Sequence, residues 1–428
     1  MLKLTPTIGM EVHVELATAS KMFCGCPAEH FAVKPNTHTC PVCLGLPGAL
    51  PVPNKKAVDW TMMIGLALGS TVNKTSKFDR KHYFYPDLPK GFQISQYDEP
   101  LCRGGQLALD SGKIINLTRV HLEEDTGKLI HQTVGGKRVS LVDFNRSGVP
   151  LVEIVTEPDI ASGAEAKEFL KKLTAILRTL KVSDCDMEKG SMRLEANVSM
   201  GESLAYKVEV KNLNSFRFVE QAIDYELSRQ EKLLKAGKTP RQETRGYDPK
   251  TRSTFVQRYK ETAEDYRYFP EPDIPPMVFS DKDIAAIRAK LPRLPEAKAK
   301  DLVDRFNLPP KLASLLVAKA SRLTYFKNSV KTAQTLKVSP EKLANLIINH
   351  KISLDKPAAE QLKTLTQKQT VDLGIIDQVI KDNPDVVAKI KAGKSSAVAF
   401  LVGQVMRLTR GQADAVAARK LLLKRLQV

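Results

Sequence analysis

The chain has 428 residues, more than one hydrophobic core usually serves, so its length predicts two or three domains. Its hydrophobic content of 42% is typical of a soluble globular protein, and the absence of any run of about 18 apolar residues excludes a membrane-spanning helix. The net charge is +18, but residues 281–428 hold 28 Lys and Arg against 13 Asp and Glu, whereas the first 280 residues hold 38 against 35. A basic appendage on a nearly neutral body favours a protein that grips a polyanion, although a lysine-rich solvated surface has the same composition.

The first 280 residues are predicted to be strands with a few inserted helices. Apolar residues alternate with polar ones from Ile8 to Leu16, which is strand periodicity. Because this pattern begins within eight residues of the start, we expect no signal or transit peptide and a cytoplasmic protein. Further strands are predicted at 114–120, 139–144, 151–155 and 206–210, with a hairpin turn at Gly135-Gly136.

Two helices are predicted within this body. Ser162-x-x-Glu165 is a capping box, and it precedes an apolar helix face that ends at Leu180. A second helix is predicted from about Phe218 to Ala236, with Gly237 as its C-terminal cap. The proline-rich stretch 266–276 closes the body, and only helical patterns follow, broken near Pro309, Pro340 and Pro357.

Four of the six cysteines form two closely spaced pairs, Cys24/Cys26 and Cys40/Cys43. Turn-borne thiolate pairs at the two ends of a short loop are what a tetrahedral zinc site requires, so the spacing predicts structural Zn²⁺. A closed site of four thiolates leaves no open coordination position, which assigns it to fold stability and not to catalysis. Cys102 and Cys185 are predicted to be buried thiols.

Several acidic residues occur where their chemistry needs an explanation. Glu11 and His13 lie on one face of the first strand, a second cluster runs from His121 to Asp125, and Glu153 interrupts an apolar run. A buried carboxylate is costly unless it is paired or binds a metal. Convergent carboxylates suit Mg²⁺, and the imidazole leaves Mn²⁺ or Zn²⁺ open.

The sequence has no standard phosphate-binding loop and no Gly-x-Ser-x-Gly nucleophile motif. This favours metal-centred phosphate chemistry over acyl-enzyme chemistry. Residues 77–97 mix basic and aromatic side chains, which suits binding of phosphates and stacking on bases, and equally suits an aromatic turn packed on the body.

These motifs resemble the B subunit family of the bacterial GatCAB aspartyl/glutamyl-tRNA amidotransferases. The resemblance is carried, in order, by residues 8–16, 40–52, 78–87, 121–127, 150–153, 211–216, 242–245, 265–270 and 400–406. The chain departs from the family pattern at Met192-Arg-Leu-Glu195, which keeps a carboxylate and loses a thiol, and in a shortened region after Asp273. In the tail, Asp414-Ala415 replaces the usual Asn-Pro.

The resemblance implies an α+β fold: a cradle-shaped β-sheet body with inserted helices, an all-α helical domain, and a small YqeY-like α-helical tail that binds tRNA. We place these domains at 1–290, 291–355 and 356–428. The implied reaction is ATP-dependent phosphorylation of the side-chain carboxyl of Glu-tRNA(Gln) or Asp-tRNA(Asn). Amidation by ammonia from the glutaminase, or A, subunit would follow, in a heterotrimer that also contains a C subunit.

The resemblance also implies roles for particular residues. By position, the Mg²⁺ ligands and catalytic residues would be Glu11, His13, Glu124 and Glu153, with Glu15, Glu123 and Asp125 behind them or near the ammonia path. Contacts to ATP or to the tRNA acceptor end would come from Arg80, Lys81, Tyr83, Lys211, Asn212 and Asn214. Cys24, Cys26, Cys40 and Cys43 match the zinc-bearing members of the family.

Other interpretations remain. A non-catalytic, zinc-bearing tRNA-binding module would use the carboxylates only to line a cavity. The archaeal-type paralogue specific for tRNA(Gln) carries an inserted domain for which this chain has no room, and a mitochondrial member would need a transit peptide.

Overall fold

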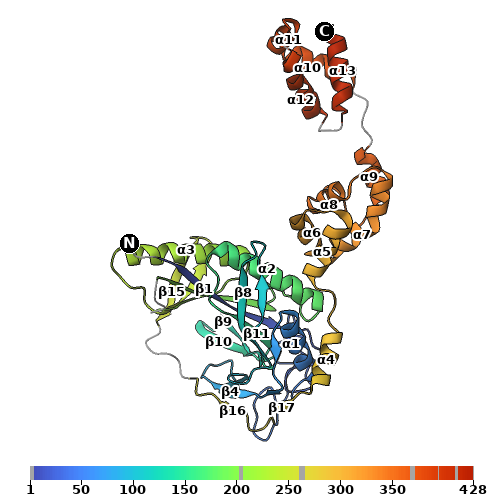
Figure 1. Ribbon diagram of the computed structural model, residues 1–428. Helices are drawn as coiled ribbons and strands as arrows, with labels where there is room; N and C mark the ends of the chain where they lie inside the picture. The colour runs from blue at the N-terminus through green and yellow to red at the C-terminus, as the bar shows by residue number, and fades with distance from the viewer. Residues whose placement is uncertain are drawn as a thin grey trace. The chain divides into compact units, whose positions relative to one another are not determined.

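The computed structural model describes residues 4–201, 206–259, 266–366, 372–393, 395–409 and 413–427. Asp265, the first residue of one family motif, lies outside them. The chain divides into two compact units, Met1–Pro295 and Glu296–Val428. The first is built on a large β-sheet, and the second is helical throughout its described residues (Figure 1). None of the described helices has both the length and the apolar character needed to cross a membrane.

A ten-stranded sheet forms the frame of the N-terminal unit. Its pairs are antiparallel except for β13 with β14, which are parallel. The strand order is β15 (Ser253–Tyr259), β14 (Glu243–Asp248), β13 (Val208–Lys211), β12 (Met192–Met200), β1 (Pro6–Glu15), β11 (Pro150–Thr156), β8 (Ile114–Glu124), β6 (Cys102–Arg103) and β2 (Thr71–Val72), with β7 (Gln106–Ala108) also paired to β8. The predicted α+β class is confirmed, and the N-terminal strand lies in the middle of the sheet.

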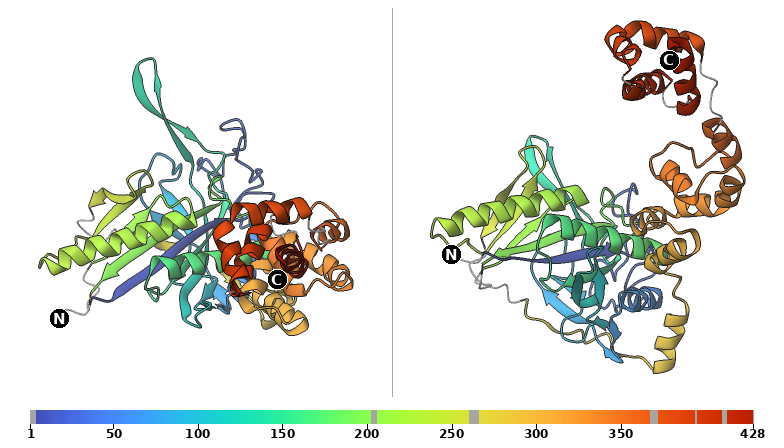
Figure 2. Two further views of the ribbon diagram at one scale, coloured as in Figure 1. Left: turned by 90° about the horizontal axis from the view of Figure 1, so that it is seen from above. Right: turned by 45° about the horizontal axis from the view of Figure 1, so that its top comes forward.

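Smaller ladders complete the body. The hairpin of β9 (Lys128–Val134) and β10 (Lys137–Asp143) turns at Gly135 and Gly136, whose φ angles of +56° and +77° confirm the predicted two-residue turn. This hairpin projects from the body in the left view of Figure 2. The other ladders are β16 (Phe269–Pro270), β4 (Asp79–His82) and β5 (Phe92–Ser95) in one, and β17 (Met277–Val278) with β3 (Thr75–Ser76) in another.

Two long helices pack beside the sheet and bury its apolar face (Figure 1). Helix α2 (Gly163–Leu180) begins where the Ser162 side chain accepts a hydrogen bond from the Glu165 amide, which is half of the predicted capping box. The Glu165 carboxylate accepts a backbone hydrogen bond from the Ala161 amide, at 2.8 Å, and not from Ser162. Helix α3 (Phe216–Lys235) ends at Ala236 and is followed by Gly237 with φ +70°, which confirms the glycine stop. Leu170 and Leu173 of α2 and Val219 of α3 share one core with the apolar strand residues.

Several elements of the body were not predicted, among them helix α1 (Lys55–Ala67), strand β12 and the paired strands β14 and β15. Helix α1 starts at Asn54, whose side chain accepts hydrogen bonds from the amides of Lys56 and Ala57. Strand β12 was missed although Met192, Leu194, Ala196 and Val198 alternate as regularly as the residues of β1. Helix α4 (Asp281–Ala289) closes the unit with a capping box at Ser280.

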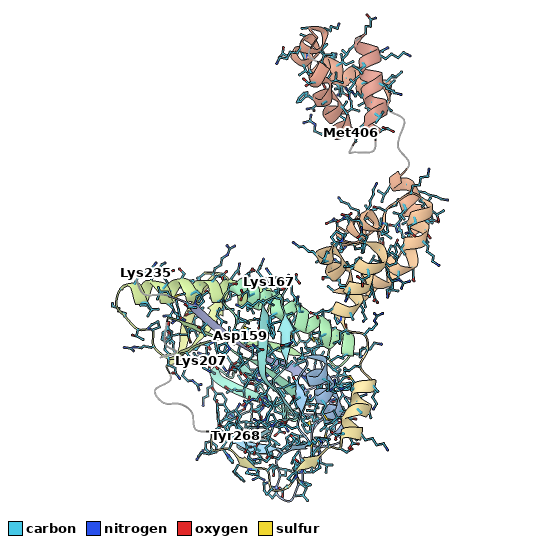
Figure 3. All side chains as sticks on the ribbon, viewed as in Figure 1. Asp159, Lys167, Lys207, Lys235, Tyr268 and Met406 are labelled. Atoms are coloured by element: carbon cyan, nitrogen blue, oxygen red, sulfur yellow. The ribbon has the colours of Figure 1, made fainter. Side chains whose placement is uncertain are left out.

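The C-terminal unit contains two separate hydrophobic cores. One core lies among α5 (Pro295–Phe306), α6 (Pro310–Val317), α7 (Ala320–Thr335), α8 (Pro340–Ile348) and α9 (Ala358–Thr366). The other lies among α10 (Leu373–Asp382), α11 (Pro384–Lys391), α12 (Val398–Leu408) and α13 (Ala415–Leu426). Met406, which is labelled in Figure 3, is partly buried and packs against this second core. The helix starts at Pro310, at Pro340 and just after Pro357 agree with the predicted breaks; the predicted domain limits near 290 and 355 stay predictions.

We predict that Gly163→Ala destabilises the N-terminal unit by about 1–3 kcal/mol, because overpacking forces packed elements apart. A Cβ atom at Gly163 would lie 2.5 Å from the Glu220 carbonyl oxygen and 2.7 Å from an Asp224 carboxylate oxygen, where α2 starts against α3. Urea unfolding followed by intrinsic fluorescence measures the change.

The matched control is Gly403→Ala in α12, where an added Cβ atom meets nothing within 4 Å. This change should leave stability unaltered or raise it by about 0.4–1 kcal/mol. Equal effects of the two substitutions would contradict the tight approach of α2 to α3.

Candidate functional site

The polar face of the central strands carries a cluster of charged residues from β1, β8, β11, β12 and β13. Because side chains alternate along a strand, Glu11 and His13 point away from Val12 and the apolar core. In the register of the sheet, His13 of β1 lies opposite Glu153 of β11, and Glu153 lies opposite His121 of β8. Three neighbouring strands therefore place an imidazole, a carboxylate and a second imidazole in one row.

His13, Glu123 and Glu153 form a group with the geometry of metal ligands. One ligand atom from each lies within 4.8 Å of the others. The His13 Nε2 atom is 3.5 Å from Glu153 Oε2 and 3.7 Å from Glu123 Oε1. In an octahedral Mg²⁺ site with bonds of about 2.1 Å, neighbouring ligand atoms are about 3 Å apart, so a small closure would fit an ion.

The protonation of this group follows from burial and charge. Burial lowers the pKa of His13, but the charge and hydrogen bond of Glu153, with the charge of Glu123, raise the pKa to about 9. Burial raises the pKa of Glu153, yet His121 and His13 together hold it well below its usual value. A proton on His13 therefore balances the carboxylates, and a divalent cation would replace that proton.

A second acidic group adjoins the first. Glu11, Glu195 and Glu209 bring carboxylate oxygens within 4.8 Å of one another. Burial, and then the charges of Glu153 and Glu195, raise the pKa of Glu11, while Asn197 donates a hydrogen bond to it at 2.7 Å. The Lys211 ammonium lies 3.1 Å from Glu195 and offsets part of this charge.

Both groups line one cavity of about 210 Å³. Its basic and aromatic wall includes Lys81, Tyr83, Arg193, Lys211 and Tyr266. Burial lowers the pKa of Lys81, but Glu123 and Glu153 outweigh burial and raise it, so this lysine carries its charge. A larger cavity of about 530 Å³ shares Lys81, Tyr83, Lys211 and Tyr266 as lining residues. The pair of cavities offers space for a phosphorylated ligand beside a metal site.

The structure brings together only some of the predicted site residues. His13, Glu153 and Glu11 line the cavity, as do Lys81, Tyr83 and Lys211. Arg80 is not among the residues that line it and instead forms a bidentate ion pair with Glu271. Asn212 and Asn214 do not line it either.

Glu124, a predicted ligand, lies apart from His13 and Glu153. Its carboxylate is 2.7 Å from the Lys90 ammonium and accepts a hydrogen bond from the Ile94 amide at 3.0 Å. Glu123, which was predicted to lie behind the ligands, occupies the position beside His13. The sequence already indicated that Glu123 faces the site, because strand alternation puts Glu123, and not Glu124, on the same face of β8 as His121.

Glu195 and Glu209 were not predicted as members of the site. Glu195 is opposite Glu11 in the pairing of β1 with β12, and Glu209 follows on β13. Their alternation with apolar neighbours marks a polar sheet face, but the pairing of these strands is not visible in the sequence.

The four predicted zinc ligands converge. The Sγ atoms of Cys24, Cys26, Cys40 and Cys43 lie within 4.8 Å of one another, and those of Cys40 and Cys43 are 3.9 Å apart. Tetrahedral Zn²⁺ with Zn–S bonds of about 2.3 Å sets its sulfur atoms about 3.8 Å apart, so the donor set fits this ion.

Hydrogen bonding within the cluster splits the pKa values of its thiols. The hydrogen bond from Cys24, aided by the Cys40 amide and the charge of Lys21, lowers the pKa of Cys43 to about 4, whereas the same hydrogen bond, together with burial, raises the pKa of Cys24. The fully buried Lys21 ammonium donates to the carbonyls of His38 and Phe144 at 2.7 and 3.2 Å, which ties the cysteine loop to the sheet.

Comparisons with known proteins agree with this architecture. A family model described as the GatB/GatE catalytic domain matches residues 6–285, and a GatB domain model matches residues 341–426. The chain belongs to the GatB family. Curated relatives that are named as the B subunit of aspartyl/glutamyl-tRNA(Asn/Gln) amidotransferase include those of Roseiflexus sp. (strain RS-1), 43% identical over 97% of each chain, and Thermomicrobium roseum, 43% identical over 98% of each. That of Thermotoga neapolitana is 41% identical over 99% of each. The resemblance stated from the motifs is confirmed over nearly the whole GatB chain.

We predict that Cys40→Ser abolishes the binding of one zinc ion per chain, because a hydroxyl does not replace a thiolate in a four-thiolate site. Elemental analysis of the purified full chain after removal of free metal measures the stoichiometry. Cys102→Ala, which changes a buried thiol outside the cluster, should keep the ion. Zinc retained by Cys40→Ser, or absent from the native chain, would contradict the assignment.

Proposed function

We propose that this chain is the B subunit of a heterotrimeric, cytoplasmic, tRNA-dependent amidotransferase. It would use ATP to phosphorylate the side-chain carboxyl of Glu-tRNA(Gln), of Asp-tRNA(Asn) or of both. Ammonia from the A subunit then attacks the acyl phosphate, forms the amide and releases inorganic phosphate. A C subunit completes the assembly.

The observation that carries this proposal is the cavity of His13, Glu123 and Glu153 within the region that matches the GatB catalytic domain. Its ligands are two carboxylates and one imidazole, a set that accepts Mg²⁺ or Mn²⁺. Mg²⁺ held there would neutralise charge on the transferring phosphoryl group. This role for Glu123 replaces the one predicted for Glu124.

The remaining lining residues have roles that follow from their charge. Lys81 and Lys211 supply ammonium groups beside the acidic floor, where they would bind phosphate oxygens of ATP. Without them, the carboxylates would repel both ATP and the acidic substrate. Tyr83 and Tyr266 offer rings at the border of the two cavities, suited to contact with a base or with the acceptor end.

The zinc site and the basic helices support the reaction without taking part in it. Four thiolates around Zn²⁺ leave no open position, so the ion would stabilise the loop that borders the body. The C-terminal helices would bind the tRNA through exposed lysines and arginines. The competing interpretation is a non-catalytic, zinc-bearing tRNA-binding module, which lacks ATP turnover.

We predict that Glu153→Gln and Glu123→Gln each lower ammonium-dependent amidation by more than about 100-fold, because each removes a charged metal ligand. The assay uses the chain co-purified with its A and C partners, supplied with ATP, Mg²⁺, ammonium and Glu-tRNA(Gln), and identifies the amino acid released from the tRNA. Ammonium bypasses the glutaminase, so the assay isolates the chemistry of this chain.

Two controls accompany this experiment. Glu124→Gln should change the Mg²⁺ requirement less than Glu123→Gln, since Glu124 pairs with Lys90. All variants should bind tRNA as the native complex does. If native protein made neither Gln-tRNA(Gln) nor Asn-tRNA(Asn) while binding tRNA tightly, the non-catalytic module would be the correct function.

The basic tail gives a separate prediction. Lys420→Gln with Lys424→Gln on the exposed face of α13 should weaken tRNA binding, and the slope of log affinity against log salt should fall by roughly 0.7–0.9 for each phosphate that is no longer neutralised. Affinities measured across a salt series test this. The control with equal charge, Lys55→Gln with Lys56→Gln on α1 of the body, should leave the slope unchanged.

A further inference from the structure

His121 is a fully buried imidazole that the function proposed above does not use. Its side chain is only 2% exposed, and it lies on β8 one strand beyond Glu153. Among the described residues, its Nδ1 atom has no hydrogen-bond partner. Burying an imidazole with one unsatisfied nitrogen costs free energy, so the contacts of the other nitrogen need an explanation.

That other nitrogen, Nε2, contacts both carboxylates of the metal group. It lies 3.1 Å from Glu153 Oε2 and 3.7 Å from Glu123 Oε2. The Glu123 Oε2 atom also accepts a hydrogen bond from the Ser95 hydroxyl at 2.9 Å. With Oε2 hydrogen-bonded to Ser95 and 3.7 Å from the His121 Nε2 atom, Glu123 turns its other oxygen, Oε1, toward His13.

His13 and His121 differ in their exposure to the cavity. His13 is 18% exposed and lines the cavity, whereas His121 is not among the described residues that line it. His121 therefore reaches the carboxylates from outside the cavity lining, and it shares Glu153 Oε2 with His13, whose Nε2 atom lies 3.5 Å from the same oxygen. An N–H donor behind a ligating carboxylate fixes its orientation and makes the site ready for the ion.

We propose that His121 is a positioning residue for the metal pocket, whose Nε2–H group orients Glu123 and Glu153 toward an ion held with His13. The inference rests on the proposed function, because it requires a divalent cation in this cavity. It assigns to His121 neither a contact with substrate nor a bond to the metal.

The test compares two amides that differ in reach. His121→Gln places an N–H donor near the position of Nε2, whereas His121→Asn places its amide near the position of Nδ1. We expect His121→Asn to bind Mn²⁺ about 10–100-fold more weakly than native protein, and His121→Gln to stay within about threefold of it. Electron paramagnetic resonance of free Mn²⁺, with the heterotrimer and no substrate, measures the affinity.

Steady-state kinetics add a second measurement. For His121→Asn, the KM for Mg²⁺ in ammonium-dependent amidation should rise by the same factor, while kcat at saturating Mg²⁺ changes little. A purely structural role would instead affect both amides alike and would lower the thermal midpoint together with kcat. His131→Asn, at an exposed histidine on β9, is the control and should leave Mn²⁺ affinity unchanged.

The outcomes separate this inference from the function beneath it. If Glu153→Gln loses Mn²⁺ and amidation while His121→Asn binds Mn²⁺ like native protein, the positioning role is overturned and the metal pocket stands. Equal losses in His121→Asn and His121→Gln would also overturn it. If Glu153→Gln binds Mn²⁺ like native protein, or if native protein binds none, the metal pocket fails and this inference with it.

Discussion

The pairing of β1 between β11 and β12 is the constraint on which the candidate site depends. Its register sets His13 opposite Glu153 on one side and Glu11 opposite Glu195 on the other. A slip of one residue would exchange the two faces of β1, burying charges in the apolar core and exposing Val12 to the cavity. The apolar contacts beneath β1 and the chemistry above it are therefore fixed by the same hydrogen-bond ladder.

This arrangement concentrates negative charge, and the cavity is stable only because cations are distributed through it. Glu123, Glu153 and Asp125 are nearly excluded from water. Burial raises the pKa of Asp125, but Arg193 and Arg146 outweigh burial and hold it below its usual value. The ammonium groups of Lys81 and Lys211 offset the negative charge of the neighbouring glutamates in the same way. A divalent ion would continue the same charge balance, since an ion bound with His13 replaces a proton with two positive charges.

Residues whose roles follow from local patterns could be predicted from the sequence. The alternation of β1, the cap at Ser162, the Gly135-Gly136 turn and the paired cysteines each depend on residues close together in the chain. Glu123 and Glu124 show the limit of reasoning from motif position, because adjacent strand residues point to opposite faces and only one can join His13. Glu195 and Glu209 enter the site through the pairing of β1 with β12 and of β12 with β13, and Ser95 reaches Glu123 by a side-chain hydrogen bond from β5. The sequence offers no local signal for these contacts.

The separation of a basic C-terminal unit from a nearly neutral body also has a physical explanation. An acidic pocket repels RNA, and the nearly neutral body supplies little long-range attraction to offset this. The helices of the C-terminal unit fill small cores with alanine and branched aliphatic residues, which leaves their many lysines on exposed positions. Attraction of a polyanion can then come from the helical unit, while Lys81 and Lys211 act only at short range inside the cavity. Attraction of a polyanion and binding of a metal ion thus depend on different residues. The cavity can therefore keep the negative charge that a metal site requires even though the proposed ligand of the protein is a polyanion.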